Sequence, residues 1–286
     1  VRTLALFPRN ELLKDQLINA LMEARKINEV LKQKALPIIR IGVWFGDTPQ
    51  SLSSSNFEKY NKNWEKTKYA NKTAWKCPFL RCPVCEVPYD LVLLNEGMGR
   101  KVSTLLCPNE SCGFEVTSNE LVFTRDDLVS PNSQCDVLFT TTESVNRQLG
   151  TVDGDRGFGL LGNSHLRSIL VDEAHIYDGL AGAQVAYLFR RIRHRVGHPL
   201  AWVSLSATLE NPADFIHDLT GLDTSIVEPK VDELEYRGAE YILAARHYLE
   251  SKKSPLSSAI QLAMLLSRML DPNDRTVKSQ GLFGKK

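Results

Sequence analysis

The sequence predicts an α/β protein in which helices flank a parallel sheet and a small cysteine-rich subdomain is inserted into the chain. Two observations carry this prediction. Short apolar runs that end in polar turns alternate with helical patterns, as they do in strand–helix–strand units. Four cysteines in two closely spaced pairs interrupt this alternation between residues 82 and 112.

The chain opens with the pattern of a strand, a helix and a second strand. Thr3–Phe7 is the first expected strand, and Asn10 is a candidate N-cap for a helix over Glu11–Lys34. Pro37 ends that helix, and Ile38–Phe45 is the next expected strand. We therefore expect the chain to begin as a βαβ unit.

Further elements are expected after the cysteine-rich segment. Residues 150–165 are interpreted as a Gly-rich loop, and no Lys-Ser or Lys-Thr follows it, so it is not expected to cradle a nucleotide. The other expected elements are strands at 136–140, 168–171, 199–205 and 225–227, a helix starting at 141, and helices at 179–196, 213–220, 241–250 and 257–270.

Bulk composition excludes some classes of function. The net charge is +1, from 35 basic and 34 acidic residues, so any nucleic-acid surface has to be local. No apolar run approaches the roughly 18 residues of a membrane span, and no signal peptide is visible, so no membrane partner and a cytoplasmic location are expected. The chain starts within a strand-like run without an initiator Met, and we expect it to be an internal part of a longer protein.

The cysteine pairs predict a structural metal site. Cys82 and Cys85 form one knuckle, Cys107 and Cys112 form a wider one, and strand-like runs at 89–94 and 101–106 lie between them. Four thiolates suit tetrahedral Zn²⁺ in a closed site, as in a zinc ribbon. Two disulfides or free thiols are the alternatives. Cys77 is a nearby spare that could replace Cys82 as a ligand, and Cys135 is expected to be a small buried residue.

An acidic pair follows the strand at Ser168–Val171. Asp172 and Glu173 come where that strand ends, which is where ligands bind in open α/β sheets. One carboxylate can hold Mg²⁺ while the other orients a water, as nucleotide hydrolysis requires. The alternative is that Asp172 only caps the next helix.

Two further polar segments have an ordinary structural alternative. The hydroxyls of Thr141, Thr142 and Ser144 start a helix, where they suit either a phosphate or simple capping. The helix at 179–196 ends in a basic cluster, for which interaction with the helix dipole is the simpler explanation.

Five short segments occur in one order, each at the end of an expected strand. The segments are Phe7–Leu12, Gly46–Pro49, Thr140–Ser144, Asp172–His175 and Ser206–Thr208. As an ordered set they resemble the first RecA-like domain of superfamily 2 DEAH-box helicases. Gly46–Pro49 and Thr140–Ser144 are most similar to bacterial helicases of DNA repair and phage defence. The resemblance covers Val1 to about Pro229 without the inserted region.

The resemblance implies a RecA-like parallel sheet and a division of the chain. Residues 1–49 and 126–229 are expected to form the two parts of the RecA-like domain. Residues 50–125 are expected to form the insertion with the zinc ribbon, which is not an obligatory feature of the family. Residues 230–286 are expected to be a helical linker toward a second RecA-like domain.

The resemblance also implies a role for individual residues. Asp172 would bind the Mg²⁺ of Mg-ATP and Glu173 would polarise the attacking water. His175 would contact the segment of Ser206, Ala207 and Thr208 and couple nucleotide state to movement. The family binds nucleic acid at positions that correspond here to Pro8, Arg9, Asn10, Gly46, Asp47, Thr141, Thr142, Glu143 and Ser144. DNA is expected as this nucleic acid rather than RNA. Other repair or defence proteins are further candidate partners.

The sequence departs from the family at the phosphate loop. No Gly-x-x-x-x-Gly-Lys-Ser/Thr occurs, and the second RecA-like domain is not seen, so the chain alone is not expected to hydrolyse ATP efficiently. The alternative function is a catalytically degenerate RecA-like module that binds nucleic acid or a protein, with the zinc ribbon as the contact. Arg81, Arg100 and Lys101 motivate a nucleic-acid role for the ribbon.

Overall fold

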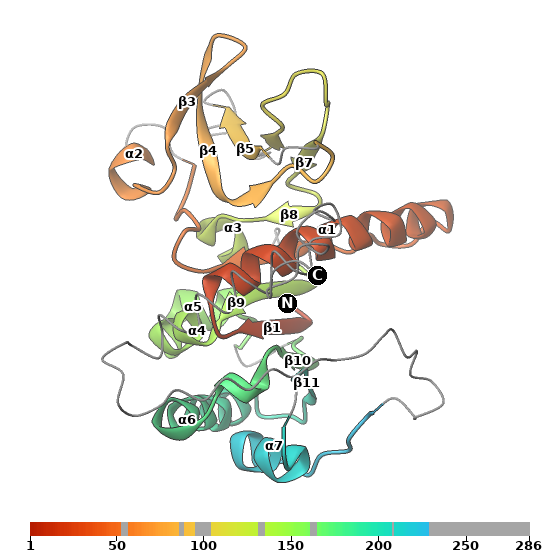
Figure 1. The fold of residues 1–286 in the computed structure, drawn as a ribbon, viewed down its shortest axis with the longest axis vertical. Coiled ribbons are helices and arrows are strands. Elements are labelled where there is room, and N and C mark those ends of the chain that lie inside the picture. Colours follow the sequence, from red (N-terminus) through yellow and green to blue (C-terminus); the bar gives the residue numbers. More distant parts are fainter. Residues whose placement is uncertain are drawn as a thin grey trace, which may run out of the picture. The chain divides into compact units, whose positions relative to one another are not determined.

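Six parallel strands form the main sheet of the protein (Figure 1). The computed structural model describes residues 1–52, 57–85, 89–94, 104–130, 135–160, 165–207 and 209–228. The expected helices at 241–250 and 257–270 lie outside these residues. In spatial order the strands are β11 (Ala201–Ser204), β10 (Ser168–Val171), β1 (Thr3–Phe7), β9 (Val137–Thr141), β2 (Ile41–Trp44) and β8 (Leu121–Val122).

Alternate residues of β1 face two different cores, because successive side chains of a strand point to opposite sides. Ala5 and Phe7 pack with the apolar side of α1 (Asn10–Gln33). Leu4 and Leu6 pack with α6 (Gly179–Val196). A parallel sheet covered on both faces confirms the predicted fold class.

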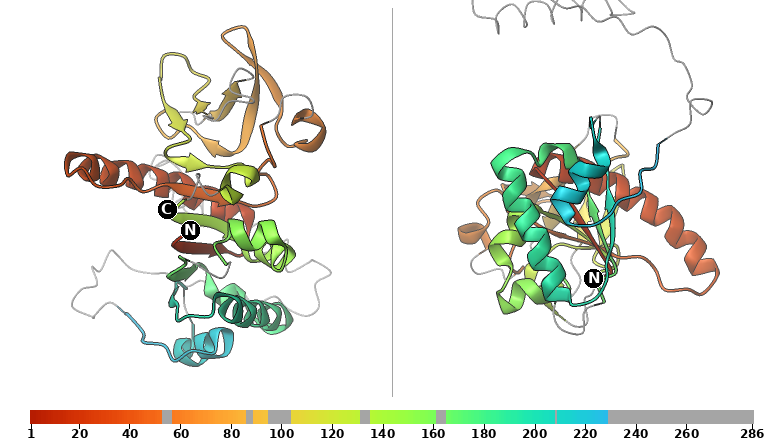
Figure 2. Two further views of the ribbon diagram at one scale, coloured as in Figure 1. Left: turned by 180° about the vertical axis from the view of Figure 1, so that it is seen from behind. Right: turned by 90° about the horizontal axis from the view of Figure 1, so that it is seen from below.

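Helices on the α6 side bury the second face of the sheet. Figure 2 shows α6 and α7 crossing beside the β11 edge. The shorter helices on this side of the sheet are α3 (Arg125–Val129), α4 (Thr142–Gln148), α5 (Val152–Gly157), the 3₁₀ turn η2 (Ala174–Ile176) and α7 (Pro212–Thr220).

The Gly-rich segment after residue 150 is partly helical, which corrects the expectation of a loop. Thr151 caps α5, since its hydroxyl accepts a hydrogen bond from the Gly154 amide at 3.0 Å. Gly157 lies against the Trp44 ring, where an added Cβ would be only 2.0 Å from a ring carbon. Gly154 and Gly157 therefore serve close packing, whereas Gly150 and Gly159 have positive φ and serve turns.

Two smaller expectations are wrong. Arg9, not Asn10, occupies the N-cap position of α1, and it makes no capping bond through its side chain. No strand forms at Ser225–Val227. The expected βαβ unit is confirmed, since β1, α1 and β2 follow one another and the two strands are parallel, with β9 between them in the sheet.

A second, antiparallel sheet occupies the β8 side of the main sheet in both views of the ribbon (Figures 1 and 2). The polar composition of residues 50–76, before the cysteines, is typical of an exposed excursion from the domain. Instead this stretch contributes Phe57, Trp64 and Trp75 to an aromatic core. The elements of the insertion are α2 (Phe57–Tyr60), β3 (Lys66–Tyr69), β4 (Lys72–Arg81), β5 (Asp90–Leu94), β6 (Thr104–Leu106) and β7 (Glu115–Thr117).

Within the described residues, no helix has the length and apolar character needed to cross a bilayer.

Candidate active site and metal centre

Asp172 and Glu173 stand directly after β10, the strand beside β1. The Asp172 amide donates to the Leu6 carbonyl at 3.0 Å and so continues the ladder between the two strands. One carboxylate oxygen of Asp172 accepts from the Glu173 amide at 3.0 Å. Glu173 adopts the left-handed conformation, with φ 48° and ψ 47°. A non-glycine residue pays a free-energy cost there, of about 1–3 kcal/mol, and such strain is common at functional turns.

His175 lies between the acidic pair and the segment after β11. The Ala174 amide donates to the Leu205 carbonyl at 2.9 Å, which ties η2 to that segment. His175 Nδ1 lies 3.2 Å from Oε2 of Glu173 and 3.4 Å from Oγ of Ser206. The side chains of Glu173 and His175 are each 34% exposed, so a ligand can reach both. Thr208 of the same predicted segment lies outside the described residues.

Tyr177 lies close to the acidic pair and was not among the residues predicted from the sequence. It is buried, and its hydroxyl has no hydrogen-bond partner in the part of the chain that the structure describes. Burial raises the pKa of Tyr177, and the Asp172 carboxylate raises it further. The phenol therefore stays neutral beside Asp172. Its sequence neighbours, the apolar Ile176 and the acidic Asp178, carry no signal of a site.

The predicted nucleic-acid segments lie at the same edge of the sheet, after β1 and β9. Arg9 is exposed directly after β1. Thr141 caps α4, because its hydroxyl accepts from the Ser144 amide at 3.2 Å. Its hydroxyl also lies 2.9 Å from the Ser144 hydroxyl. The capping alternative therefore accounts for Thr141, while Glu143 remains exposed.

Asp47, in the turn after β2, is held by the insertion and by α1. Its carboxylate pairs with Lys14 at 2.8 Å and accepts from the Asn63 amide at 2.6 Å. Its carbonyl accepts from the Trp64 indole at 2.9 Å. The Asp47 side chain is thus committed to joining three segments, a role that its place in the sequence did not indicate.

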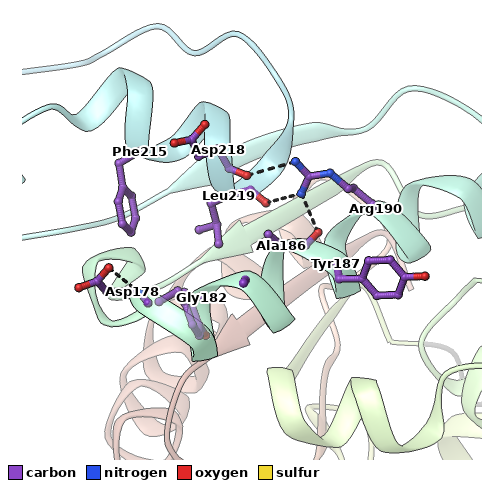
Figure 3. Close-up of a pocket in the computed structure, with 11 residues that line it drawn as sticks. Asp178, Gly182, Ala186, Tyr187, Arg190, Phe215, Asp218 and Leu219 are labelled. Atoms are coloured by element: carbon purple, nitrogen blue, oxygen red, sulfur yellow. Dashed lines mark hydrogen bonds between the residues drawn. The ribbon is translucent and has the colours of Figure 1, made fainter.

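The basic end of α6 holds neighbouring helices together. Arg190 donates to the carbonyls of Asp218 and Leu219 at the end of α7, at 3.2 and 3.5 Å (Figure 3). Arg193 donates to the Thr220 carbonyl at 3.1 Å. These guanidinium groups satisfy free carbonyls at the C-terminus of α7, so they cap a neighbouring helix, which the predicted interaction with the dipole of their own helix did not include.

Cys82, Cys85, Cys107 and Cys112 come together in a cluster able to hold a metal ion. All four sulfur atoms lie within 4.8 Å of one another. The sulfurs of Cys82 and Cys112 are 3.6 Å apart, and those of Cys85 and Cys107 are 3.7 Å apart. Zn–S bonds of about 2.3 Å in a tetrahedron place the sulfurs about 3.8 Å apart. The geometry fits that arrangement and not two disulfides, whose S–S bonds are about 2 Å long.

The thiols of the cluster are shifted in opposite directions: burial raises the pKa of Cys107 to about 12, whereas that of Cys82 is lowered. Although burial raises the pKa of Cys82, the backbone amides of Val84 and Cys85 lower it, with a net shift downward. Cys77 lies apart from the cluster, and burial raises the pKa of its thiol to about 12. The structure therefore brings together the four predicted ligands, with Cys82 rather than Cys77 among them.

Comparison with solved structures found two helicases. The Mycobacterium smegmatis helicase Lhr bound to ssDNA and AMP-PNP aligns with a TM-score of 0.47 at 21% identity, covering 80% of this chain and 20% of that chain. The DUF1998 helicase MrfA bound to DNA aligns with a TM-score of 0.37 at 19% identity, covering 77% and 18% of the two chains.

Sequence comparison found curated relatives, although no family model matches the chain. The uncharacterized ATP-dependent helicase MJ1574 of Methanocaldococcus jannaschii is 30% identical over 145 residues, which are 49% of this chain and 19% of that protein. The ATP-dependent helicase HRQ1 of Saccharomyces cerevisiae is 40% identical over 65 residues, 21% of this chain and 6% of that protein. The chain thus spans about a fifth of the first relative's length, and over about half of its own length it is homologous to ATP-dependent helicases.

Proposed function

We propose that this chain is the first RecA-like domain of a superfamily 2 DEAH-box helicase, which couples ATP hydrolysis to movement along DNA. One observation carries the proposal: Asp172 and Glu173 follow a strand beside β1, and His175 joins Glu173 to Ser206. The homology to ATP-dependent helicases supports it. The likeness of the Gly46 turn and the Thr-Glu-Ser segment to DNA-repair helicases favours DNA as the track.

Asp172 fits the role of a magnesium ligand. Its Oδ1 accepts the Glu173 amide, whereas its Oδ2 has no hydrogen-bond partner among the described residues. A carboxylate oxygen is the ligand type that Mg²⁺ prefers, directly or through water. Mg²⁺ bound there would neutralise charge on the phosphates of ATP.

Glu173 is the proposed water-orienting residue. Glu173 follows β10 in the left-handed conformation, and its carboxylate lies 3.2 Å from His175 Nδ1. An ionised carboxylate accepts a hydrogen bond from a water and aligns it for attack. His175 then links this group to the segment after β11, which makes the histidine a positioning residue for coupling.

Backbone contacts to DNA are proposed for the segments after β1 and β9. Arg9 offers an exposed cation, and Pro8 and Asn10 flank it. Thr142, Glu143 and Ser144 offer the start of α4. Asp47 would act by holding the Gly46 turn in place, since its carboxylate is already paired. Contacts of this kind give affinity without reading sequence.

Zinc is the proposed metal at the four cysteines, in a structural role. The sulfur separations match a tetrahedral site, and thiolate ligands require a reducing compartment. We therefore propose a cytoplasmic location. A second RecA-like domain of the same protein is the proposed partner that closes on ATP.

The test is the ATPase rate of the full-length protein, with and without single-stranded DNA and RNA. We expect stimulation by DNA, and loss of turnover in Glu173→Gln with nucleotide affinity retained. Glu23→Gln, at an exposed position of α1, is the matched control and should keep full activity. DNA binding without any ATP turnover would favour the degenerate binding module instead.

A further inference from the structure

A hollow of about 480 Å³ opens beside the Gly46 turn, where the insertion leaves the main sheet. Gly46 and Gln50 contribute from the turn after β2, Tyr60 and Asn61 from α2 and the residue after it, and Arg125 from the start of α3. The volume falls within the range of small-ligand sites. The hollow lies after the carboxyl end of a strand, on the edge of the sheet that also carries Arg9 and Thr141.

Arg125 gives this hollow a cation without a counter-charge. Its Nη2 donates to the Phe45 carbonyl at 3.2 Å, and its guanidinium carbon lies 5.9 Å from the centre of the Trp44 ring. Its Nε is buried and has no hydrogen-bond partner. Burial, and then the charge of Arg147, lower the pKa of Arg125 below its ordinary value. In the described part of the chain no carboxylate pairs with this guanidinium.

Two nearby carboxylates already have partners. Glu58 pairs with Lys66 at 2.7 Å, and Asp126 accepts from the side chain of Gln50, a residue that lines the hollow, at 2.6 Å. The Lys59 ammonium lies 5.5 Å from the centre of the Tyr60 ring and adds positive charge beside that ring. The hollow therefore favours an anionic ligand.

Tyr60 supplies a flat aromatic surface beside that charge. It is the last residue of α2 and is 70% exposed, unlike the buried aromatic residues around it. An exposed aromatic ring next to a basic groove is the arrangement by which proteins stack bases of single strands. A phosphate and a base therefore match the two features together, whereas a free phosphate would use only the cation.

We propose that this hollow binds one nucleotide of a single strand, with Arg125 contacting its phosphate and Tyr60 stacking on its base. The inference rests on the proposed function, because the strand is the track of the proposed helicase. It adds a contact between the insertion and the strand, so that α2 and α3 extend the proposed nucleic-acid-binding surface beyond Arg9 and Thr141.

The experiment measures binding of a fluorescein-labelled 20-nucleotide oligo(dT) to the full-length protein by fluorescence anisotropy. Tyr60→Ala should weaken binding about tenfold, because stacking on an aromatic side chain is lost. Tyr60→Phe keeps the ring and should bind like the wild type. Tyr187→Ala is the matched control, since Tyr187 is 67% exposed on α6 and far from the hollow in sequence; its affinity should not change.

The salt dependence tests Arg125 separately. Arg125→Gln should reduce the slope of log affinity against log salt by about 0.7, the value for one phosphate contact on a single strand. Tyr60→Ala should leave the slope unchanged. Wild-type protein cross-linked to 5-bromouracil-substituted oligonucleotide should carry the adduct at Tyr60, and this readout does not depend on the folding of a variant.

The outcomes separate the two proposals. Equal binding by wild type and Tyr60→Ala, or an adduct only at other residues, would overturn the inference and leave the proposed function standing. No binding of oligo(dT) by the wild type would overturn both.

Discussion

His175 Nδ1 lies 3.2 Å from a carboxylate oxygen of Glu173. The same nitrogen lies 3.4 Å from the Ser206 hydroxyl, on the segment after the neighbouring strand. A ring nitrogen carries at most one hydrogen, so it donates well to one of these groups at a time. Drawing Glu173 toward a water would free the nitrogen for Ser206, which is a physical route from nucleotide state to the segment after β11.

Replacing His175 should uncouple hydrolysis from movement. In His175→Ala we expect unwinding to fall at least tenfold, while basal ATPase stays within about threefold of wild type, because Glu173 and Asp172 remain. The measurement compares strand separation with ATP turnover in the full-length protein. His217→Ala is the matched control, because His217, on α7, pairs with the exposed carboxylate of Asp223 after the end of that helix. Equal losses of both activities in His175→Ala would contradict a coupling role.

Metal content should depend on the clustered cysteines alone. Purified protein is expected to contain one zinc ion per chain by elemental analysis, and Cys85→Ser should lose it together with a lower melting temperature. Binding free energy of a structural zinc is largely folding free energy, so a chelator should destabilise the wild type. Cys77→Ala should retain its zinc, because Cys77 lies outside the cluster. Loss of zinc in Cys77→Ala would show that the ligand set is wrong.

Arg25 and Glu120 should stabilise the protein in a pH-dependent way. Arg25 Nε donates to Glu120 at 2.6 Å, and the guanidinium lies 4.6 Å from the centre of the Phe114 ring. Burial raises the pKa of Glu120, but Arg25 and the Thr117 amide lower it by more, so the net shift is below 4.5. A carboxyl group whose pKa is lower in the folded state stabilises the fold at pH values above its pKa in the unfolded state. That stabilisation is lost as the pH falls through the pKa of the folded state.

The pH dependence is measured against Glu120→Gln. The difference in the free energy of unfolding between wild type and variant should be present at pH 6 and should shrink below about pH 4.5. Urea unfolding at several pH values checks this. Glu23→Gln, from an exposed pair with Lys26, should show little difference at any pH. If the difference in unfolding free energy for Glu120→Gln grew on acidification, the pKa of Glu120 would be shifted in the opposite direction. The stabilising role of Arg25 and Glu120 would then be refuted.

Arg195 should be needed for the packing of α5. Asp155 is fully buried, and it accepts from Arg195 Nε at 2.9 Å and from the Gly150 amide at 3.0 Å. Arg195→Ala would leave a buried carboxylate short of a partner, at a cost of about 1–3 kcal/mol in unfolding free energy. Arg191→Ala, which loses only a bond to Asn146, is the control and should cost about 1 kcal/mol or less. Similar stabilities for the two variants would contradict the special role of Asp155.

Local patterns determined much of the fold. β1 is found at Thr3–Phe7, and α6 at Gly179–Val196, as the apolar runs and periodicity predict. The four clustered cysteines were readable because ligand spacing is a local property. Asp172 and Glu173 could be identified as a candidate site because they directly follow the apolar residues of an expected strand.

Contacts between distant residues could be decided only by the tertiary structure. Insertion of β9 between β1 and β2 depends on pairing across more than 90 residues, which no local pattern encodes. The helix α5 depends on Gly157 fitting against Trp44, a contact across more than 100 residues. The polar stretch after residue 50 read as exposed because its aromatic residues are sparse in sequence and meet only after the antiparallel sheet forms. Sequence alone thus determined five of the six strands of the main sheet, the clustered cysteines and the acidic pair, whereas packing decided which side chains surround them.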